Sequence, residues 1–239
     1  LGITGSDARR LEAGLEWILR SLDNQGHTCL PVDQLIGRLD DLLQTDVDDI
    51  ANFIESLLEQ GALYSTYYED ILYIYPPEMY VSEVESVHYT KDFLLEADPI
   101  SLDIPSFIEK FEADNHITFG DAQKEAIQLS FFEKFSLITG GPGTGKTTII
   151  KALVKGFQLG GLGRIILCAP TGRAAKRLTE ATEFEATTIH RLLVPVQGSD
   201  SYDFTKNEDD PLDIDVIIID EASMLNVRLF YSLMAAIPK

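Results

Sequence analysis

The stretch GGPGTGKT at residues 140–147 has the residue types and spacing needed to hold phosphate groups. Its four glycines let the backbone curl so that several N–H groups converge on phosphate oxygens. Lys146 adds an ammonium for the β- and γ-phosphates, and the Thr147 hydroxyl is a ligand for Mg²⁺. The stretch matches G-x-x-x-x-G-K-[ST] between an apolar run, FSLITG, and a helix-like run, TTIIKAL. This context predicts a nucleotide phosphate loop rather than a plain glycine turn.

A second candidate for chemistry is DVIIIDEASML at residues 215–225. The β-branched run from Val216 to Ile219 is typical of a strand buried on both faces. It leads directly into Asp220 and Glu221, and two adjacent carboxylates are costly to bury without a partner. Beside a phosphate loop, Asp220 would hold Mg²⁺ through its waters and Glu221 would orient and deprotonate the attacking water. The alternative is a solvated strand end.

Composition limits the class of protein. The chain has 239 residues, which favours two domains over one, and its hydrophobic share of 45% and charged share of 24% are those of a soluble globular protein. No apolar run approaches the roughly 20 residues of a membrane helix, and no signal peptide is visible. Cys29 and Cys168 lack metal or redox spacing, so we expect reduced thiols and a cytoplasmic protein without membrane contact.

The net charge of −20 is unevenly distributed. Residues 1–119 carry 24 acidic and 6 basic side chains, a net charge of −18. Residues 120–191 carry 6 acidic and 10 basic side chains, a net charge of +4, and residues 192–239 return to −6. The basic block coincides with the motifs, which favours a nucleic-acid partner there, although any nucleotide-binding domain needs some local positive charge.

Residues 1–98 predict a small, mostly helical, winged-helix-like domain. Helical spacing covers 7–23, GHTCLPVDQLIGRLDDLL and VDDIANFIESLLEQGALY, and ILYIYPPEMY predicts a strand. The helix at 47–60 stands where a recognition helix would lie, but it carries four acidic residues and no basic one. DNA phosphates would repel it, so we expect a packing or partner-docking module rather than a DNA reader. Residues 82–98 predict a connecting helix.

The prolines at 99 and 105 predict a linker over 99–119. From residue 120 onward strands and helices alternate. FSLITG, RIILCAP and DIDVIIID predict strands, with helices in DAQKEAIQLSFFEK, TTIIKALVKGFQLGG and GRAAKRLTEAT. This order is typical of an α/β fold with a parallel sheet, so residues 120–239 predict a P-loop nucleotide-binding domain.

These motifs resemble those of a known family. LITGGPGTGKTT, LCAPTGRAAKRLTEAT, ATTIHRLL and VIIIDEASM resemble helicase motifs I, Ia, Ib and II of the RecD-like enzymes of superfamily 1B, and FGDAQKEAI resembles their Q motif. Residues 7–98 resemble, more loosely, the domain that precedes the motor in the longer members. The resemblance implies a RecA-like motor and an ATP-dependent 5′→3′ DNA helicase of repair or recombination, acting on single strands and duplex junctions.

The resemblance also implies roles for individual residues. Gln123 would read the adenine edge, with an exposed polar residue as the alternative. The phosphates and Mg²⁺ would be held by Gly141, Pro142, Gly143, Thr144, Gly145, Lys146, Thr147 and Thr148, with Asp220 completing the metal site and Glu221 and Lys146 acting in catalysis. Single-stranded DNA would meet Thr171, Gly172 and Arg173 after Pro170, and Thr188 and His190. A simple strand-to-helix cap is the alternative for Thr171 and Arg173, and a structural histidine is the alternative for His190.

Residues 194–213 lie where the family inserts a β-hairpin pin that splits the duplex, although an ordinary surface hairpin fits equally well. The family continues beyond AAIPK with motif III and a second RecA-like domain, so we expect this sequence to be a piece of a longer protein that binds nucleotide without translocating. Two other classes stay open: a conjugative relaxase-helicase, which would show a histidine cluster and a nucleophilic tyrosine upstream, and a non-catalytic nucleotide-binding adaptor. A protein partner would dock through the N-terminal domain.

Overall fold

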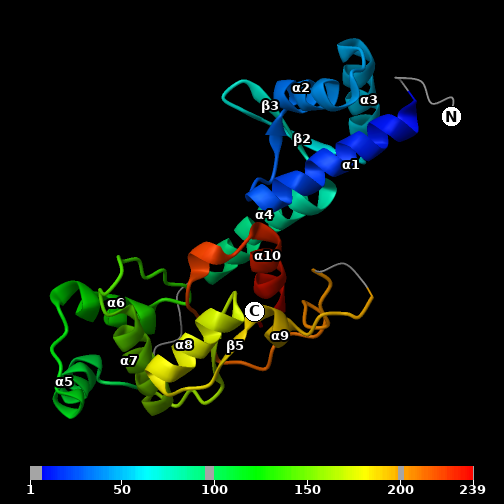
Figure 1. Cartoon of the computed structure of the whole chain (residues 1–239). Coiled ribbons are helices and arrows are strands. Elements are labelled where there is room, and N and C mark those ends of the chain that lie inside the picture. Colours follow the sequence, from blue (N-terminus) through cyan, green and yellow to red (C-terminus); the bar gives the residue numbers. More distant parts are fainter. Residues whose placement is uncertain (1–6, 95–99, 199–201, 239) are drawn as a thin grey trace. The chain divides into compact units, whose positions relative to one another are not determined.

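A computed structural model describes residues 7–94, 100–198 and 202–238. The chain divides into two compact units (Figure 1). Unit 1 comprises Leu1–Glu85 with Asn226–Arg228, and unit 2 comprises Ser86–Leu225 with Leu229–Lys239. Among the described residues, no helix combines the length and apolar character that crossing a membrane requires.

Unit 1 has the predicted winged-helix-like order. Its elements are α1 (Ala8–Gln25), β1 (Leu30–Pro31), α2 (Val32–Leu43), α3 (Val47–Glu59), β2 (Tyr64–Tyr68) and β3 (Ile71–Tyr75). Apolar side chains of all three helices, including Ile18, Leu39 and Ile54, form one buried core with Ile74 of β3. The strands form an antiparallel sheet in the order β1-β3-β2. Of these three strands, the sequence predicted only β3. Strand β1 was missed because it has two residues, and β2 was missed because all of its side chains are exposed and it has no apolar buried face.

The acidic helix α3 begins at a local cap. The Asp46 carboxylate accepts a hydrogen bond from the Asp48 N–H at 2.9 Å, which satisfies one of the donors at the helix start. Asp48, Asp49 and Glu55 are exposed. Helix α4 (Pro77–Phe93) then begins five residues earlier than the predicted connecting helix at 82–98, whose last residues lie outside the described part.

The linker predicted over 99–119 is wrong for most of its length. Residues Ile104–Asn115 form α5, with Asp103 as its N-cap and Pro105 in its first turn, where proline suits a helix. The buried side chains of α5 are Ile104, Phe107, Ile108 and Phe111. They pack with apolar residues of the next two helices, α6 (Asp121–Phe132) and α7 (Lys146–Leu159). The segment is therefore part of the core of unit 2.

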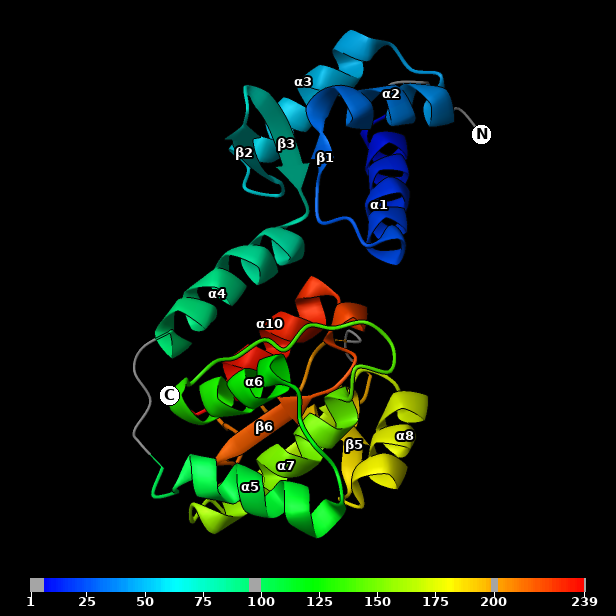
Figure 2. The ribbon, with the colours of Figure 1, turned by 90° about the vertical axis from the view of Figure 1, so that its left-hand side faces the viewer.

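Unit 2 contains the predicted parallel sheet, in the order β5-β4-β6. Its strands are β4 (Ile165–Ala169), β5 (Ala186–Thr188) and β6 (Val216–Ile219). Helix α8 (Gly172–Thr182) connects β4 to β5 and lies beside β5 (Figure 2). Helix α9 (Ile189–Leu193) follows β5 (Figure 1). The chain continues to a 3₁₀ turn, η1 (Ala222–Met224), and α10 (Val227–Ala236). A parallel three-stranded sheet flanked by helices confirms the RecA-like P-loop fold class.

Helix α7 packs closely against its neighbours. Its Ile149 and Leu153 share a core with Val216 and Ile218 of β6. At Gly156 the approach is so close that a Cβ atom would collide with the rings of Phe131 and Phe107.

The predicted strand FSLITG does not form. Residues 135–140 pair with no strand of the described chain, and the Leu137 side chain is 72% exposed. Both edges of β4 are paired, with β5 and β6, and residues 135–140 add to neither outer edge of this sheet; nothing in the structure explains why. All four residues of β6 are half-buried, and both faces of the strand are covered as predicted: Val216 and Ile218 pack against one apolar core, and Ile217 and Ile219 pack against another.

An ionic cluster ties the start of β4 to the start of β6. The Arg164 guanidinium hydrogen bonds to Asp213 and Asp215, and Asp215 also accepts the backbone N–H groups of Gly163 and Arg164. The hydrogen bonds from Arg164 lower the pKa of Asp215 to about 2.

We predict that Asp215→Asn lowers the urea midpoint of unfolding at neutral pH. A carboxyl pKa below its ordinary value of about 3.9 stabilises the fold above pH 4, and this stabilisation disappears as pH falls towards 2. The gap between wild type and variant should therefore be largest at pH 7 and shrink on acidification. Asp213→Asn, at a carboxylate that is 84% exposed, is the control with the smaller effect. A gap that stays constant with pH would contradict this role.

Candidate functional site

The phosphate loop lies directly before α7. Gly143 and Gly145 adopt φ of 73° and 80°, the left-handed region that glycine enters without strain. The Lys146 ammonium folds back over the loop and donates to the carbonyl oxygens of Gly140 at 2.5 Å and Gly141 at 2.9 Å. The Thr144 hydroxyl also donates to Gly141, at 2.9 Å. The only side-chain cation of the loop is thus held over it by neutral carbonyls.

The loop fits a polyphosphate. A Cβ placed on Gly141 or Gly143 meets nothing within 4 Å, so the space above these glycines is open. The N-terminal end of α7 adds partial positive charge, and the Lys146 ammonium is near enough to exchange carbonyl oxygens for phosphate oxygens. Thr147 and Thr148 are half-buried in the first turn of α7, and a hydroxyl oxygen is a donor that Mg²⁺ accepts.

Gln123 joins helix α6 to the phosphate loop. Its side-chain oxygen accepts the Gly120 N–H at 2.8 Å, and its amide nitrogen donates to the Thr144 carbonyl at 2.8 Å. The same nitrogen lies 2.6 Å from where a Cβ of Gly145 would stand, so a side chain there would displace the Gln123 amide, and the φ of 80° would strain it as well. The structure therefore places Gln123 against the loop backbone.

Glu112 of α5 positions the start of α6, and the sequence did not point to it. One carboxylate oxygen accepts the Phe119 N–H at 2.6 Å, and the other accepts the Lys124 ammonium at 3.1 Å. The Phe119 backbone hydrogen bond and then Lys124 lower the pKa of Glu112. Glu112 thus fixes the residues on both sides of Gly120, the N-cap of α6. No sequence pattern signalled this role, because Glu112 lies on the polar face of α5 and that segment was predicted to be a linker.

The carboxylate pair lies at the carboxyl end of β6. The Asp220 N–H continues the sheet pattern by donating to the Cys168 carbonyl at 2.9 Å, and the Asp220 carboxylate accepts the Glu221 N–H at 3.0 Å. Glu221 has φ of 55°, a left-handed conformation that is strained for a residue with a side chain. Strained backbone of this kind is common at functional sites. Burial raises the pKa of the neighbouring Cys168 to about 12, so its thiol stays protonated at neutral pH.

The residues predicted to meet DNA lie at the same edge of the sheet, because β4, β5 and β6 are parallel. The Thr171 hydroxyl caps α8 by accepting the Ala174 N–H at 3.2 Å, and the Thr188 hydroxyl caps α9 by accepting the Arg191 N–H at 3.2 Å. Thr171 therefore has the cap role that was the alternative to a DNA contact, and Thr188 has a cap role that was not predicted.

Helix α8 is amphipathic. Arg173, Lys176 and Arg177 are exposed, whereas Ala175 and Leu178 are buried. The helix therefore presents its basic side chains to solvent. Gly172, its first residue, is exposed.

His190 packs against the segment predicted as a pin. Its ring lies 5.8 Å from Phe204 and 6.4 Å from Tyr202, measured between centroids. Residues 194–196 and 203–205 lie antiparallel, with an isolated bridge between Pro195 and Phe204 and the Val196 N–H donating to the Asp203 carbonyl at 2.9 Å. Part of the predicted turn, residues 199–201, lies outside the described residues.

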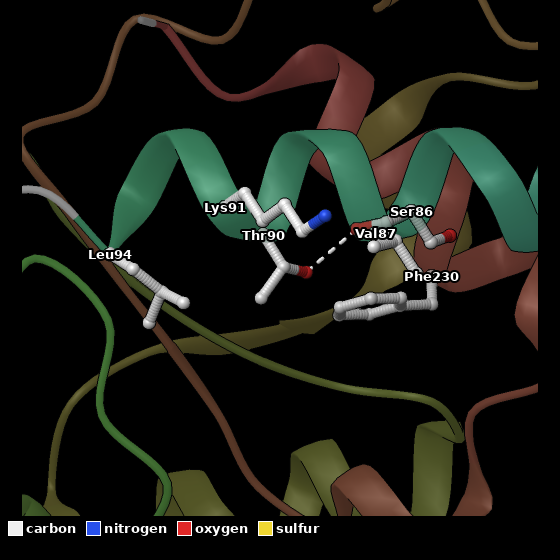
Figure 3. Close-up of a pocket in the computed structure, with 6 residues that line it drawn as sticks. All are labelled: Ser86, Val87, Thr90, Lys91, Leu94 and Phe230. Carbon is white, nitrogen blue, oxygen red and sulfur yellow. Dashed lines mark hydrogen bonds between the residues drawn. The ribbon is translucent and has the colours of Figure 1, made fainter.

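A shallow hollow of about 340 Å³ lies in unit 2, away from these residues. It is lined by Ser86, Val87, Thr90, Lys91, Leu94 and Phe230 (Figure 3). The Thr90 hydroxyl donates to the Ser86 carbonyl at 2.7 Å within α4. This hollow therefore offers little convergent polar chemistry, and the candidate site is the edge that carries the motifs. The described residues also contain no group of three or more His, Cys, Asp or Glu side chains placed to hold a metal ion.

Comparison with known proteins agrees with this geometry. A family model described as "AAA domain" matches residues 123–239. The ATP-dependent RecD2 DNA helicase of Deinococcus radiodurans is 46% identical over 102 residues, 43% of this chain and 14% of that protein. The RecBCD enzyme subunit RecD of Mycolicibacterium smegmatis is 35% identical over 139 residues, 49% of this chain and 25% of that protein.

The chain is a partial-length match to the RecD-like helicases of superfamily 1. The ATP-dependent DNA helicase dda of Enterobacteria phage T4 is also similar, with 41% identity over 105 residues, 42% of this chain and 24% of that protein. This RecD-like chain spans no more than a quarter of the length of these three relatives.

We predict that Gln123→Ala weakens binding of Mg·ATP and of Mg·tripolyphosphate alike, by about fivefold for the loss of one net hydrogen bond. The reason is that its amide holds the Thr144 carbonyl and thereby the loop, whatever base is attached. Titration calorimetry with both ligands measures this. Gln128→Ala, an exposed glutamine on the same helix, is the matched control. A loss confined to ATP would show that Gln123 reads only the adenine.

Proposed function

We propose that this RecD-like chain carries the nucleotide site of an ATP-dependent DNA helicase, using Mg²⁺. The observation that supports it most is the phosphate loop. Its Lys146 ammonium is held by two backbone carbonyls, and the space next to Gly141 and Gly143 is open. In this proposal Lys146 binds the β- and γ-phosphates and Thr147 with Asp220 provides oxygen ligands for the metal. Glu221, at the end of β6, orients water and accepts its proton. Bound Mg²⁺ would supply charge neutralisation of the phosphates.

We also propose that single-stranded DNA lies across the start of α8. The backbone N–H groups there and the exposed side chain of Arg173 would meet phosphates, and Lys176 and Arg177 would meet the next ones. The segment predicted as a pin, residues 194–213, is proposed as the element that meets the duplex junction. We propose translocation in the 5′→3′ direction, a role in DNA repair or recombination and a cytoplasmic location on the basis of the family resemblance of the motifs alone.

A non-catalytic nucleotide-binding adaptor is the second candidate. Such a protein needs the phosphate loop but no water-activating carboxylate. The presence of Glu221 next to Asp220, in a strained conformation at the sheet edge, favours catalysis. A relaxase-helicase would be distinguished by a histidine cluster with a tyrosine nucleophile, and the described residues contain no His, Cys, Asp or Glu cluster suited to a metal.

We predict that Lys146→Ala weakens binding of a fluorescent ATP analogue by roughly 10- to 100-fold, because a charge-assisted contact to phosphate is lost. Fluorescence anisotropy with Mg²⁺ is the measurement, and binding is the suitable readout for a chain that spans only part of its relatives. Lys151→Ala removes another ammonium from α7, one that is paired with Glu183 at 3.0 Å, and should leave the affinity unchanged. Equal affinities of wild type and Lys146→Ala would refute the nucleotide site.

We predict that Arg173→Ala weakens binding of a labelled single-stranded oligonucleotide and flattens the plot of log K against log salt concentration by about 0.7. The physical reason is the loss of one phosphate contact and of the counterion release that accompanies it. The matched control is Arg20→Ala, at an exposed arginine of unit 1. An unchanged salt slope for Arg173→Ala, or an equal change for Arg20→Ala, would place the DNA elsewhere.

A further inference from the structure

Strand β2 has an open edge. In the antiparallel sheet of unit 1 it is the outer strand, and it pairs with β3 from Tyr64↔Tyr75 to Tyr68↔Ile71 on one side only. The backbone N–H and C=O groups of its other side therefore have no strand partner in the described chain. An edge of this kind is a template onto which another extended segment can add.

This edge lacks the usual protection against such pairing. Natural edge strands are commonly short, charged or interrupted by proline, but residues 61–68, GALYSTYY, contain no charged side chain and no proline. Instead the strand exposes three tyrosines: Tyr64 is 40% exposed, Tyr67 73% and Tyr68 64%. Ile71, opposite Tyr68, is 45% exposed. We name these four side chains and the open side of β2 the tyrosine edge.

The tyrosine edge is partly preorganised. The Tyr64 ring stacks on Tyr80 with centroids 4.7 Å apart and planes 9° apart, and Tyr80 also meets Tyr75 edge-on at 5.6 Å. A tyrosine held in this way loses little conformational entropy when a partner covers it. Tyrosines are also among the residues that carry most of the binding energy at protein interfaces.

Charge selects the partner. Residues 1–85 contain 17 acidic side chains, four arginines and no lysine, a net charge of −13. At the tip of the hairpin, Glu69 and Asp70 both adopt positive φ, of 47° and 63°. Asparagine and glycine are the residues that favour such a turn, so this tip carries two negative charges at a cost in backbone strain. DNA and a second copy of this chain would both be repelled.

We propose that the tyrosine edge binds a basic, extended segment of another protein, which adds to β2 as a further strand. Main-chain hydrogen bonds would give affinity, as in other cases of strand addition. Lysine or arginine side chains of the segment would lie over the rings of Tyr67 and Tyr68 and near the carboxylates of Glu69 and Asp70. This specifies the surface and partner chemistry for the docking role expected of the N-terminal domain. It does not depend on the motor activity, because its test uses no nucleotide.

The probe is a labelled ten-residue peptide of alternating lysine and valine, titrated into the 239-residue chain by fluorescence anisotropy. We expect binding, with backbone amide shifts in NMR spectra concentrated at residues 64–68. The double variant Tyr67→Ser with Tyr68→Ser, at side chains too exposed to matter for folding, should weaken binding about tenfold or more. Glu69→Lys with Asp70→Lys should do the same.

Matched variants on α1 separate this surface from general acidity. Trp17→Ser removes another aromatic side chain, 63% exposed, and Glu12→Lys with Glu16→Lys makes the same change in net charge. Both should bind the peptide as wild type does, and a glutamate–valine peptide should not bind. The proposal is overturned if the α1 variants weaken binding equally or if the amide shifts lie away from β2. It is also overturned if the same tyrosines instead support self-association or binding of a single-stranded oligonucleotide.

Discussion

The pairing of β4 along both of its edges is the constraint on which unit 2 depends. Because β5 and β6 are both parallel to β4, the segments that follow all three strands emerge at one edge of the sheet. The basic start of α8, the Thr188 cap and the Asp220–Glu221 pair are brought together in this way, although they are far apart in the sequence. Residues 135–140 add no strand to this sheet. The phosphate loop is positioned by α7, which follows it, and by the hydrogen bond from Gln123.

Much of this fold could be predicted from local patterns, and the failures have physical causes. Strands β4 and β6 and helix α8 carry strong apolar periodicity and were expected. Helix α5 had the same signal at Ile104, Phe107, Ile108 and Phe111, but Pro105 was interpreted as a linker residue although it occupies a favourable first-turn position. Strand β2 could not be predicted from an apolar pattern, because none of its side chains is buried and it therefore shows no alternation of core and surface residues.

At the candidate site, residue identities were predictable but their partners were not. The phosphate loop and the carboxylate pair are encoded by side-chain type at fixed spacing, so a sequence motif finds them. The contact of Gln123 is with a backbone carbonyl, which every residue has, and no sequence pattern marks it. Glu112 likewise acts through the N–H of Phe119. Such positions are visible only when the backbone is in place.

The close approach at Gly156 has a consequence for how this domain can vary. Any side chain there would push α7 away from the rings of Phe131 and Phe107, and Phe131 belongs to the helix that carries Gln123. The hydrogen bond from Gln123 to the loop tolerates only a small displacement. A substitution far from the phosphates would thus loosen the loop while leaving every motif residue intact. Gly156 is accordingly a natural position for temperature-sensitive alleles, in which the lesion is one of spacing between two helices.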